Sequence, residues 1–254
     1  MTARAWEPQL DREKRRRLDI SEREWRMSKL SYEDRQHLWM RWFVYFVGII
    51  ILAFGISLTI KAKDLGISPW DVLHYGLYTQ FGLTVGSWSI IVGIFIVSLS
   101  CAARKTWPKI GTILNMVFIG IFIDFFLFIL PDPGALWMDF LTLMVGLLIA
   151  GYGIGLYVAA KLGAGPRDTL MLLLTEKTGW KVQWVRIGLE VIVLILGYLL
   201  GGPVGIGTVI ASVLLGSIVG FSLPQSERLL EYLIWRRKSS ENFNEGTVRL
   251  NDHD

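Results

Sequence analysis

The chain has 254 residues, of which 52% carry apolar side chains, and its mean hydropathy is +0.45. This hydropathy excludes an ordinary soluble domain, and long internal segments without charge predict a polytopic membrane protein. The formal net charge is +4, but the basic residues lie at the termini and in short loops, which favours membrane orientation and contact with anionic lipid over nucleic-acid binding. The single cysteine, Cys101, excludes an intrachain disulfide and a cysteine metal cluster.

The first predicted element is a charged extension, residues 1–41, whose densest basic patch is Lys14–Arg17. A segment this polar is not a cleaved signal peptide, which needs an apolar stretch. Ser31, with Asp34 three residues later, predicts a helix that begins near Tyr32 and runs into the first span. We expect the extension to orient the protein and to contact the lipid surface, with a protein partner as the alternative.

Six segments of suitable length and apolarity to span a membrane follow the extension. Tryptophans fall near the ends of these segments, as in an interfacial aromatic belt, and Trp70 is among them. Lys and Arg concentrate in alternate loops, one of which holds Arg167, so both termini are predicted to be cytoplasmic. The predicted spans are 42–60, 86–103, 110–130, 138–160, 184–200 and 204–223.

Two similar motifs break the apolar sequence, LGISPWDVL at Leu65–Leu73 and LGAGPRDTL at Leu162–Leu170, 97 positions later. Each has a proline suited to the first position of a helix and, two residues on, an aspartate that complements the positive end of the helix dipole. Ser68 is predicted to cap the first helix by accepting a hydrogen bond from a backbone amide, and Gly165 takes the corresponding position in the second. Capping alone explains either motif, but the duplication favours a functional site.

The helices that begin at these motifs, about 69–80 and 166–178, are too short to cross a bilayer. They either lie at the interface or enter the membrane as re-entrant half-helices, and the sequence leaves both arrangements open. Exposure of the broken backbone to lipid is excluded, because its polar groups need protein or water around them.

The similarity between the two halves extends beyond the motifs, so the chain is predicted to contain two repeats, 42–131 and 138–224, with three spans each. An odd number of spans per repeat turns the second copy upside down. The predicted fold class is therefore an all-α membrane protein with six transmembrane helices in two inverted three-helix repeats, each with a Gly/Pro-broken short helix after its first span. Residues 225–254 are predicted to form an amphipathic helix and a disordered tail. The matching glycines are Gly48 and Gly146, Gly55 and Gly153, Gly82 and Gly179, Gly111 and Gly207, and Gly120 and Gly216.

The two motifs are the predicted substrate-binding site, because broken segments at matching places in two halves mark the sites of many transporters. Arg167 suits an anionic solute, whereas Asp71 and Asp168 suit a cation, so the sign of the solute stays open. The candidate substrate-binding residues are Ser68, Trp70, Asp71, Gly165, Arg167 and Asp168.

Two carboxylates within the predicted spans, Asp124 and Glu190, are candidates for ion coupling, because ionisable groups at that depth usually face a cavity or the bundle interior. For Glu190 the alternative is an ion pair with Arg186, one helical turn away, with Arg186 extending to the inner interface. His74 and Asn115 are interpreted as structural hydrogen-bonding residues.

Sequence patterns of catalysis and of cofactor binding are missing. We find no H-E-x-x-H motif, no P-loop and no nucleophile elbow, and Gly151-x-x-x-Gly155 is interpreted as a helix-packing face. We therefore expect no catalytic residues, no metal and no cofactor, and we do not expect an enzyme.

The stretch RWFVYFVGIIILAFGISLTIKA, followed by LGISPWDVLHYGL and FGLTVGSWSIIVG, resembles the YczE/YitT-like bacterial integral membrane proteins. The resemblance covers about 41–223, and the GISPWD box is its most specific part. It implies a multi-pass protein of the bacterial cytoplasmic membrane, and it implies no substrate or reaction.

The leading functional hypothesis is a small transporter or channel-like permease for an ion or small polar solute. The alternative is a non-transporting membrane scaffold or regulatory partner that acts through the basic N-terminal region. The expected partners are the lipid bilayer and a small solute or ion, without nucleic acid, while a homo-oligomer or a protein partner stays open.

Overall fold

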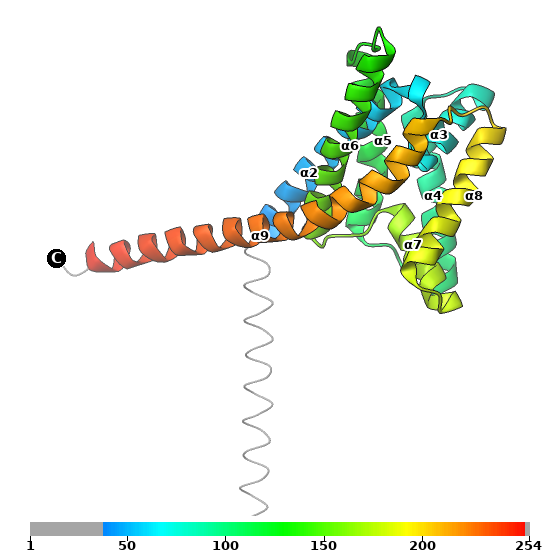
Figure 1. Ribbon diagram of the computed structural model, residues 1–254. Helices are drawn as coiled ribbons and strands as arrows, with labels where there is room; N and C mark the ends of the chain where they lie inside the picture. Colours follow the sequence, from blue (N-terminus) through cyan, green and yellow to red (C-terminus); the bar gives the residue numbers. More distant parts are fainter. Residues whose placement is uncertain (1–37, 252–254) are drawn as a thin grey trace, which may run out of the picture. The chain divides into compact units, whose positions relative to one another are not determined.

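The computed structural model describes the backbone of residues 38–251 and the side chains of residues 38–234, and all of the regular structure in that part of the chain is helical (Figure 1). The predicted charged extension, including the helix capped by Ser31, lies almost wholly outside the described residues.

Six helices of this part of the chain are long and apolar enough to cross a membrane, which confirms the predicted number of spans. Each contains about as many residues as a bilayer core requires. They are α2 (Leu38–Lys61), α4 (Val85–Arg104), α5 (Ile110–Ile129), α6 (Leu136–Ala159), α8 (Val182–Leu199) and the portion of α9 (Ile206–Asn251) up to Ile234.

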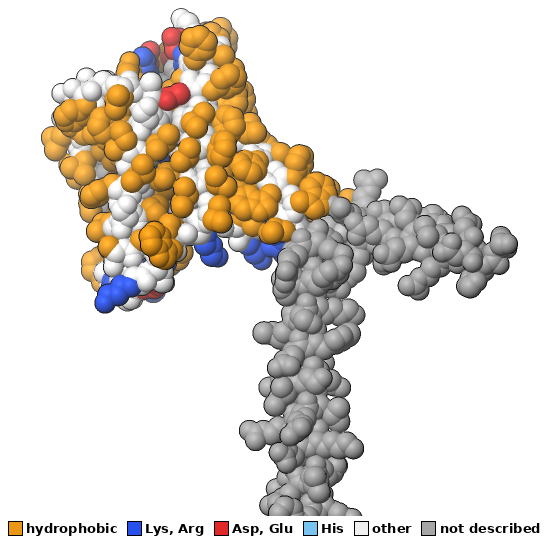
Figure 2. Space-filling view, turned by 180° about the vertical axis from the view of Figure 1, so that it is seen from behind, with side chains coloured by type: hydrophobic (Ala, Val, Ile, Leu, Met, Phe, Trp, Pro, Cys, Tyr) orange, Lys and Arg blue, Asp and Glu red, His pale blue; other side chains and the backbone are white. Residues whose placement is uncertain are grey.

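The outer surface of these helices is apolar. Phe95, Phe128 and Ile187 are 68%, 90% and 51% exposed. Figure 2 shows orange side chains over the middle of the surface, with Lys, Arg, Asp and Glu gathered mainly toward its two ends. An exposed apolar surface of this extent suits lipid and not water.

The close crossing of α2 and α6 forms the centre of the fold. A Cβ atom built on Gly48 would lie 2.6 Å from the Tyr157 nitrogen, and one built on Gly55 would lie 2.4 Å from the Ala150 nitrogen. The earlier residue of α2 thus faces the later residue of α6, so the two helices are antiparallel. Only residues without side chains allow two backbones to approach this closely.

Replacing Gly55 with alanine is expected to lower the free energy of unfolding of the detergent-solubilised protein by about 1–3 kcal/mol, because the new methyl group has no space against the α6 backbone. Thermal or denaturant unfolding measures the change. Gly188→Ala in α8 is the matched control, since a Cβ atom there meets nothing within 4 Å. Equal stability of the two variants would contradict the close crossing.

Two short helices, α3 (Pro69–Phe81) and α7 (Pro166–Thr178), each begin beside the middle of a longer helix. Trp70, at the start of α3, packs against Val193 in α8 and Ile96 in α4. A Cβ atom on Gly93, halfway along α4, would lie 3.4 Å from the Cγ atom of Pro166 at the start of α7.

The two short helices also end beside the ends of longer helices. The side chains of Thr79 and Gln80, near the end of α3, donate hydrogen bonds of 3.1 Å to the carbonyl of Leu200, just after α8. Near the end of α7, Glu176 forms an ion pair of 3.0 Å with Arg104 at the end of α4. Each short helix therefore runs from beside the middle of one long helix toward the end of the helical unit, which is the geometry of a re-entrant half-helix.

The loops gather at two ends of the helical unit. At one end, Lys61, the last residue of α2, forms an ion pair of 3.0 Å with Asp132 in the α5–α6 loop. There too Gly66, which follows the 3-10 helix η1 (Lys63–Leu65), packs so closely on Gly205 that a Cβ atom would lie 2.3 Å from the Gly205 nitrogen. At the other end, Tyr45 donates a hydrogen bond to the carbonyl of Gly111 at the start of α5.

The end of the chain differs from the sequence expectation. We predicted a separate amphipathic helix after residue 225 and a disordered tail, whereas α9 continues through Pro224 to Asn251 without a break. A proline removes one backbone donor, and membrane helices tolerate this loss where the freed carbonyl finds another partner.

Candidate solute-binding site

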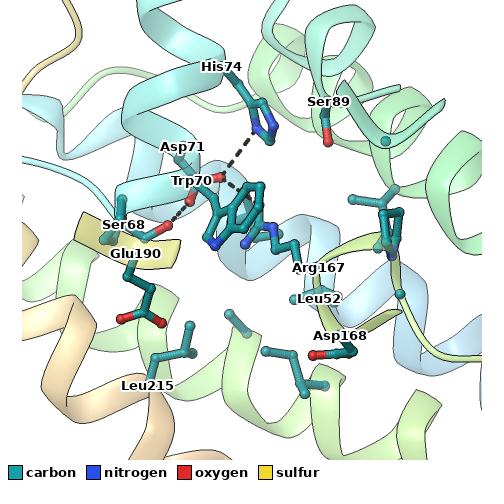
Figure 3. A pocket seen from close by; sticks show the side chains of 18 of the residues that line it. Leu52, Ser68, Trp70, Asp71, His74, Ser89, Arg167, Asp168, Glu190 and Leu215 are labelled. Atoms are coloured by element: carbon teal, nitrogen blue, oxygen red, sulfur yellow. Dashed lines mark hydrogen bonds and ion pairs between the residues drawn. The ribbon is translucent and has the colours of Figure 1, made fainter. Parts of the chain in front are cut away.

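A cavity of about 220 Å³ lies between the beginnings of α3 and α7. It is lined by residues of both sequence motifs and also by side chains from the long helices. All six predicted substrate-binding residues border it, namely Ser68, Trp70, Asp71, Gly165, Arg167 and Asp168. The fold thus brings together two segments 97 positions apart, as Figure 3 shows for the labelled side chains.

The first motif differs from its prediction in one hydrogen bond. Ser68 does occupy the N-cap position of α3 and Pro69 the first helical position, but the Ser68 side chain accepts no bond from a backbone amide. Instead its hydroxyl donates to the Asp71 carboxylate. Ser68 therefore orients Asp71, which is 2% exposed.

The second motif holds its aspartate through a residue from another helix. Gly165 is the N-cap of α7, and the hydroxyl of Tyr157 in α6 donates a hydrogen bond of 3.1 Å to Asp168. A Cβ atom on Gly165 would lie 3.3 Å from the Tyr157 hydroxyl oxygen. Tyr157 thus takes the role for Asp168 that Ser68 takes for Asp71, and glycine at position 165 leaves room for it.

Arg167 connects the two motifs across the cavity. Its guanidinium carbon lies 5.0 Å from the ring centroid of Trp70, and its Nη2 atom lies 3.6 Å from Oδ1 of Asp71. Two sequence expectations are corrected here. Trp70 is 7% exposed and is not an interfacial belt residue, and Arg167 is a cavity residue and not a loop charge.

Polar atoms on the wall of the cavity lack hydrogen-bond partners among the described residues. They include Oδ1 of Asp71 and Nδ1 of His74, which lie 3.9 Å apart.

The two ion-coupling candidates have different positions. Glu190 lines the cavity and forms an ion pair of 3.0 Å with Arg186, one turn earlier in α8. Arg186 also lines the cavity, so the pair belongs to the site. Asp124 is not among the lining residues. Its carboxylate accepts hydrogen bonds from Thr84 and from the Gly86 amide at the beginning of α4, which is a helix-capping contact.

Sequence reasoning missed several polar residues that line the cavity, among them Tyr157, His74 and Asn115. His74 and Asn115 are 3% and 2% exposed and were interpreted as structural. One signal was available for Tyr157, since its hydroxyl lies within an apolar helix and needs a hydrogen-bond partner there. The partner itself, on a different helix, is not readable from the sequence.

Residues 39–224 match the family described as a family of unknown function, DUF6198. The uncharacterized membrane protein YczE of Bacillus subtilis is 55% identical over 206 residues, which cover 81% of this chain and 96% of the relative. An uncharacterized protein of Haemophilus influenzae is 36% identical over 74% of this chain and 88% of its own length. The uncharacterized protein YyaS of Bacillus subtilis is 31% identical over 74% of this chain and 95% of its own length. No solved structure matches the chain. The match to most of the chain, and to nearly the whole of its bacterial relative, means that this multi-span membrane protein belongs to the DUF6198 family.

Proposed function

We propose that this protein is a small transporter, or a channel-like permease, that binds a small polar or charged solute in the cavity between α3 and α7. The observation that carries the proposal is the meeting of the two broken motifs at one cavity whose lining includes carboxylate and guanidinium groups. Ionisable groups at membrane depth are costly and usually serve a solute or ion pathway. Broken helices that begin at mid-depth are a common device of secondary transporters.

The proposal includes an inverted repeat, and paired contacts support it. Gly48 packs on Gly153 and Gly146 packs on Gly55, so the contact of α2 on α6 has a counterpart with the two repeats exchanged. Likewise α3 packs on α8 while α7 packs on α4. Exchange of equivalent contacts between two antiparallel units is what a two-fold axis in the membrane plane produces.

The loops of the same two repeats make a further exchanged pair of contacts. A Cβ atom on Gly66 would lie 2.6 Å from the Thr208 hydroxyl oxygen, and one on Gly163 would lie 3.0 Å from that of Thr112. Gly66 and Gly163 match in the alignment of the repeats, as do Thr208 and Thr112. This second exchange supports the same axis.

Both termini are proposed to be cytoplasmic, in the bacterial cytoplasmic membrane. The end of the helical unit that contains the α4–α5 and α6–α7 loops is rich in basic residues, whereas the opposite end has only Lys61 and Lys63 among the described residues. Loops enriched in Lys and Arg stay in the cytoplasm. The basic residues at the proposed cytoplasmic end are Arg104, Lys105, Lys109, Lys161, Lys177 and Lys181.

Arg167 gives a physical basis for alternating access. It extends from the second repeat to Asp71 and Trp70 of the first. A rocking motion of one repeat against the other would change these contacts, so a bound solute that competes for Asp71 biases the equilibrium between the two arrangements.

Reconstituted protein is expected to bind at least one member of a panel of ions and small metabolites, measured as a thermal shift in detergent, and to carry it across proteoliposome membranes. Deletion of residues 1–30 is expected to leave this flux intact, because the deleted residues lie outside the cavity-lining helices. A scaffold would instead show no flux and would lose its function with the deletion. Absence of both binding and flux across the panel would contradict transport.

A further inference from the structure

The formal charges of the side chains that line the cavity do not balance. Three of these side chains are carboxylates and two are guanidinium groups. Glu190 is paired with Arg186 at 3.0 Å, and Asp71 faces Arg167 at 3.6 Å. Among the side chains of residues 38–234, none forms an ion pair with Asp168, whose carboxylate accepts a hydrogen bond from the Tyr157 hydroxyl. One formal negative charge is left over, at Asp168.

The helix dipoles do not favour an anion at this place. The beginnings of α3 and α7 both border the cavity, and a helix N-terminus attracts negative charge. Here Asp71 and Asp168 lie in the first turns of these same helices and supply that charge themselves. An anionic solute would therefore meet two carboxylates of the protein next to the dipoles.

A second observation is a buried carboxylate oxygen that lacks a hydrogen-bond donor in the described part of the chain. The Asp71 side chain is 3% exposed, and its Oδ1 atom has no hydrogen-bond donor among the described residues. Figure 3 shows this carboxylate on the wall of the cavity together with Trp70 and Arg167. A carboxylate oxygen only accepts, so the cavity suits a ligand that brings N–H or O–H donors. An ammonium group brings three such donors and the missing positive charge.

The remaining wall of the cavity is apolar. Side chains from four different long helices contribute to it, including Leu52, Ile96, Met116, Leu147 and Ile154. A hydrated metal ion gains nothing from contact with such a surface. Burial of a short alkyl chain against it, by contrast, stabilises binding by about 0.8 kcal/mol per methylene group.

We infer that the transported solute is a small organic cation of the alkylammonium class, with its ammonium group paired to Asp168 and its alkyl part on the apolar wall. This inference rests on the proposed transport function and specifies its substrate.

The test compares three probes with four carbon atoms each, n-butylammonium chloride, sodium butyrate and n-butanol, by thermal shift and calorimetry on the full-length protein in detergent. Butylammonium is expected to stabilise the protein, with little effect of the other two. Stronger binding of butyrate or butanol, no binding of butylammonium, or an equal shift with sodium chloride at the same ionic strength would each overturn the inference. Binding or flux of an anion or a neutral solute would leave the transport proposal standing, so the two failures are distinguishable.

Asp168→Asn is expected to weaken butylammonium binding by about tenfold or more, because it removes a charge-assisted hydrogen bond. Asp124→Asn is the matched control, since it neutralises a carboxylate of a membrane span that does not line the cavity and should leave the affinity unchanged. Equal affinities of the two variants would overturn the role of Asp168. The three-probe comparison uses the unaltered chain, so it decides the inference even where the Asp168→Asn protein does not fold.

Discussion

Replacing Arg167 with glutamine is expected to destabilise the protein by about 3–5 kcal/mol, because the change leaves the buried Asp71 carboxylate without its cationic partner. The Asp71 side chain is 3% exposed, and the Arg167 guanidinium lies 3.6 Å from its Oδ1 atom. The substitution also removes the contact of the guanidinium with the Trp70 ring, which is 5.0 Å away. Unfolding of the purified protein in detergent measures the loss.

A double-mutant cycle separates the pair from the general effect of each change. The variant with both Asp71→Asn and Arg167→Gln is expected to recover much of the stability lost by Arg167→Gln alone, because no unpaired charge stays buried. Arg186→Gln is the matched control. Its ion pair with Glu190 lies within one helix, and the two side chains are 44% and 21% exposed, so the expected loss is below about 1 kcal/mol. Strictly additive effects of the Asp71 and Arg167 changes would show that the two motifs are not coupled.

Single cysteines at the ends of the two half-helices are expected to react from opposite sides of the membrane. Gln80→Cys, near the end of α3, should react with a membrane-impermeant maleimide added outside intact cells. Lys177→Cys, near the end of α7, should react only after the membrane is opened. The expected contrast is nearly all-or-none, because a charged reagent does not cross the hydrocarbon core.

The labelling needs a background without Cys101, the single native cysteine, which Cys101→Ser provides. Asp132→Cys and Lys105→Cys are the references for the proposed outer and cytoplasmic ends. Reaction of positions 80 and 177 from the same side would refute the inverted repeat, and the transport mechanism built on it would fail as well. Reversal of all four positions would refute only the assignment of the termini to the cytoplasm.

The spans were predictable because their physical signal is local. A run of about 20 apolar residues has few alternatives to a membrane helix, and Leu136–Ala159 or Val85–Arg104 can be recognised without any contact partner. The starts of α3 and α7 were predictable for a similar reason, since Pro69 and Pro166 fit only the first turn of a helix. The bounds of α9 were not predictable, because a proline in the sequence suggests the end of a helix, whereas α9 continues through Pro224.

The composition of the cavity was partly predictable. The duplication of the two motifs indicated that Asp71 and Asp168 belong to one site, and both line the cavity. Asp124 and Tyr157 had no comparable signal. A carboxylate within a span looks the same in sequence whether it caps a neighbouring helix, as Asp124 does, or lines a cavity, as Glu190 does.

The sequence by itself determined the class of protein, the six spans and the two places where the helices break, because apolar length, proline and glycine act on the residues next to them. Only the tertiary structure decided that Arg167 lies on Trp70 and beside Asp71, that Tyr157 holds Asp168, and that Asp124 caps α4. Each of these contacts joins two different helices. Their relative placement follows from the close backbone packing at Gly48, Gly55 and Gly153, which no local pattern of residues specifies.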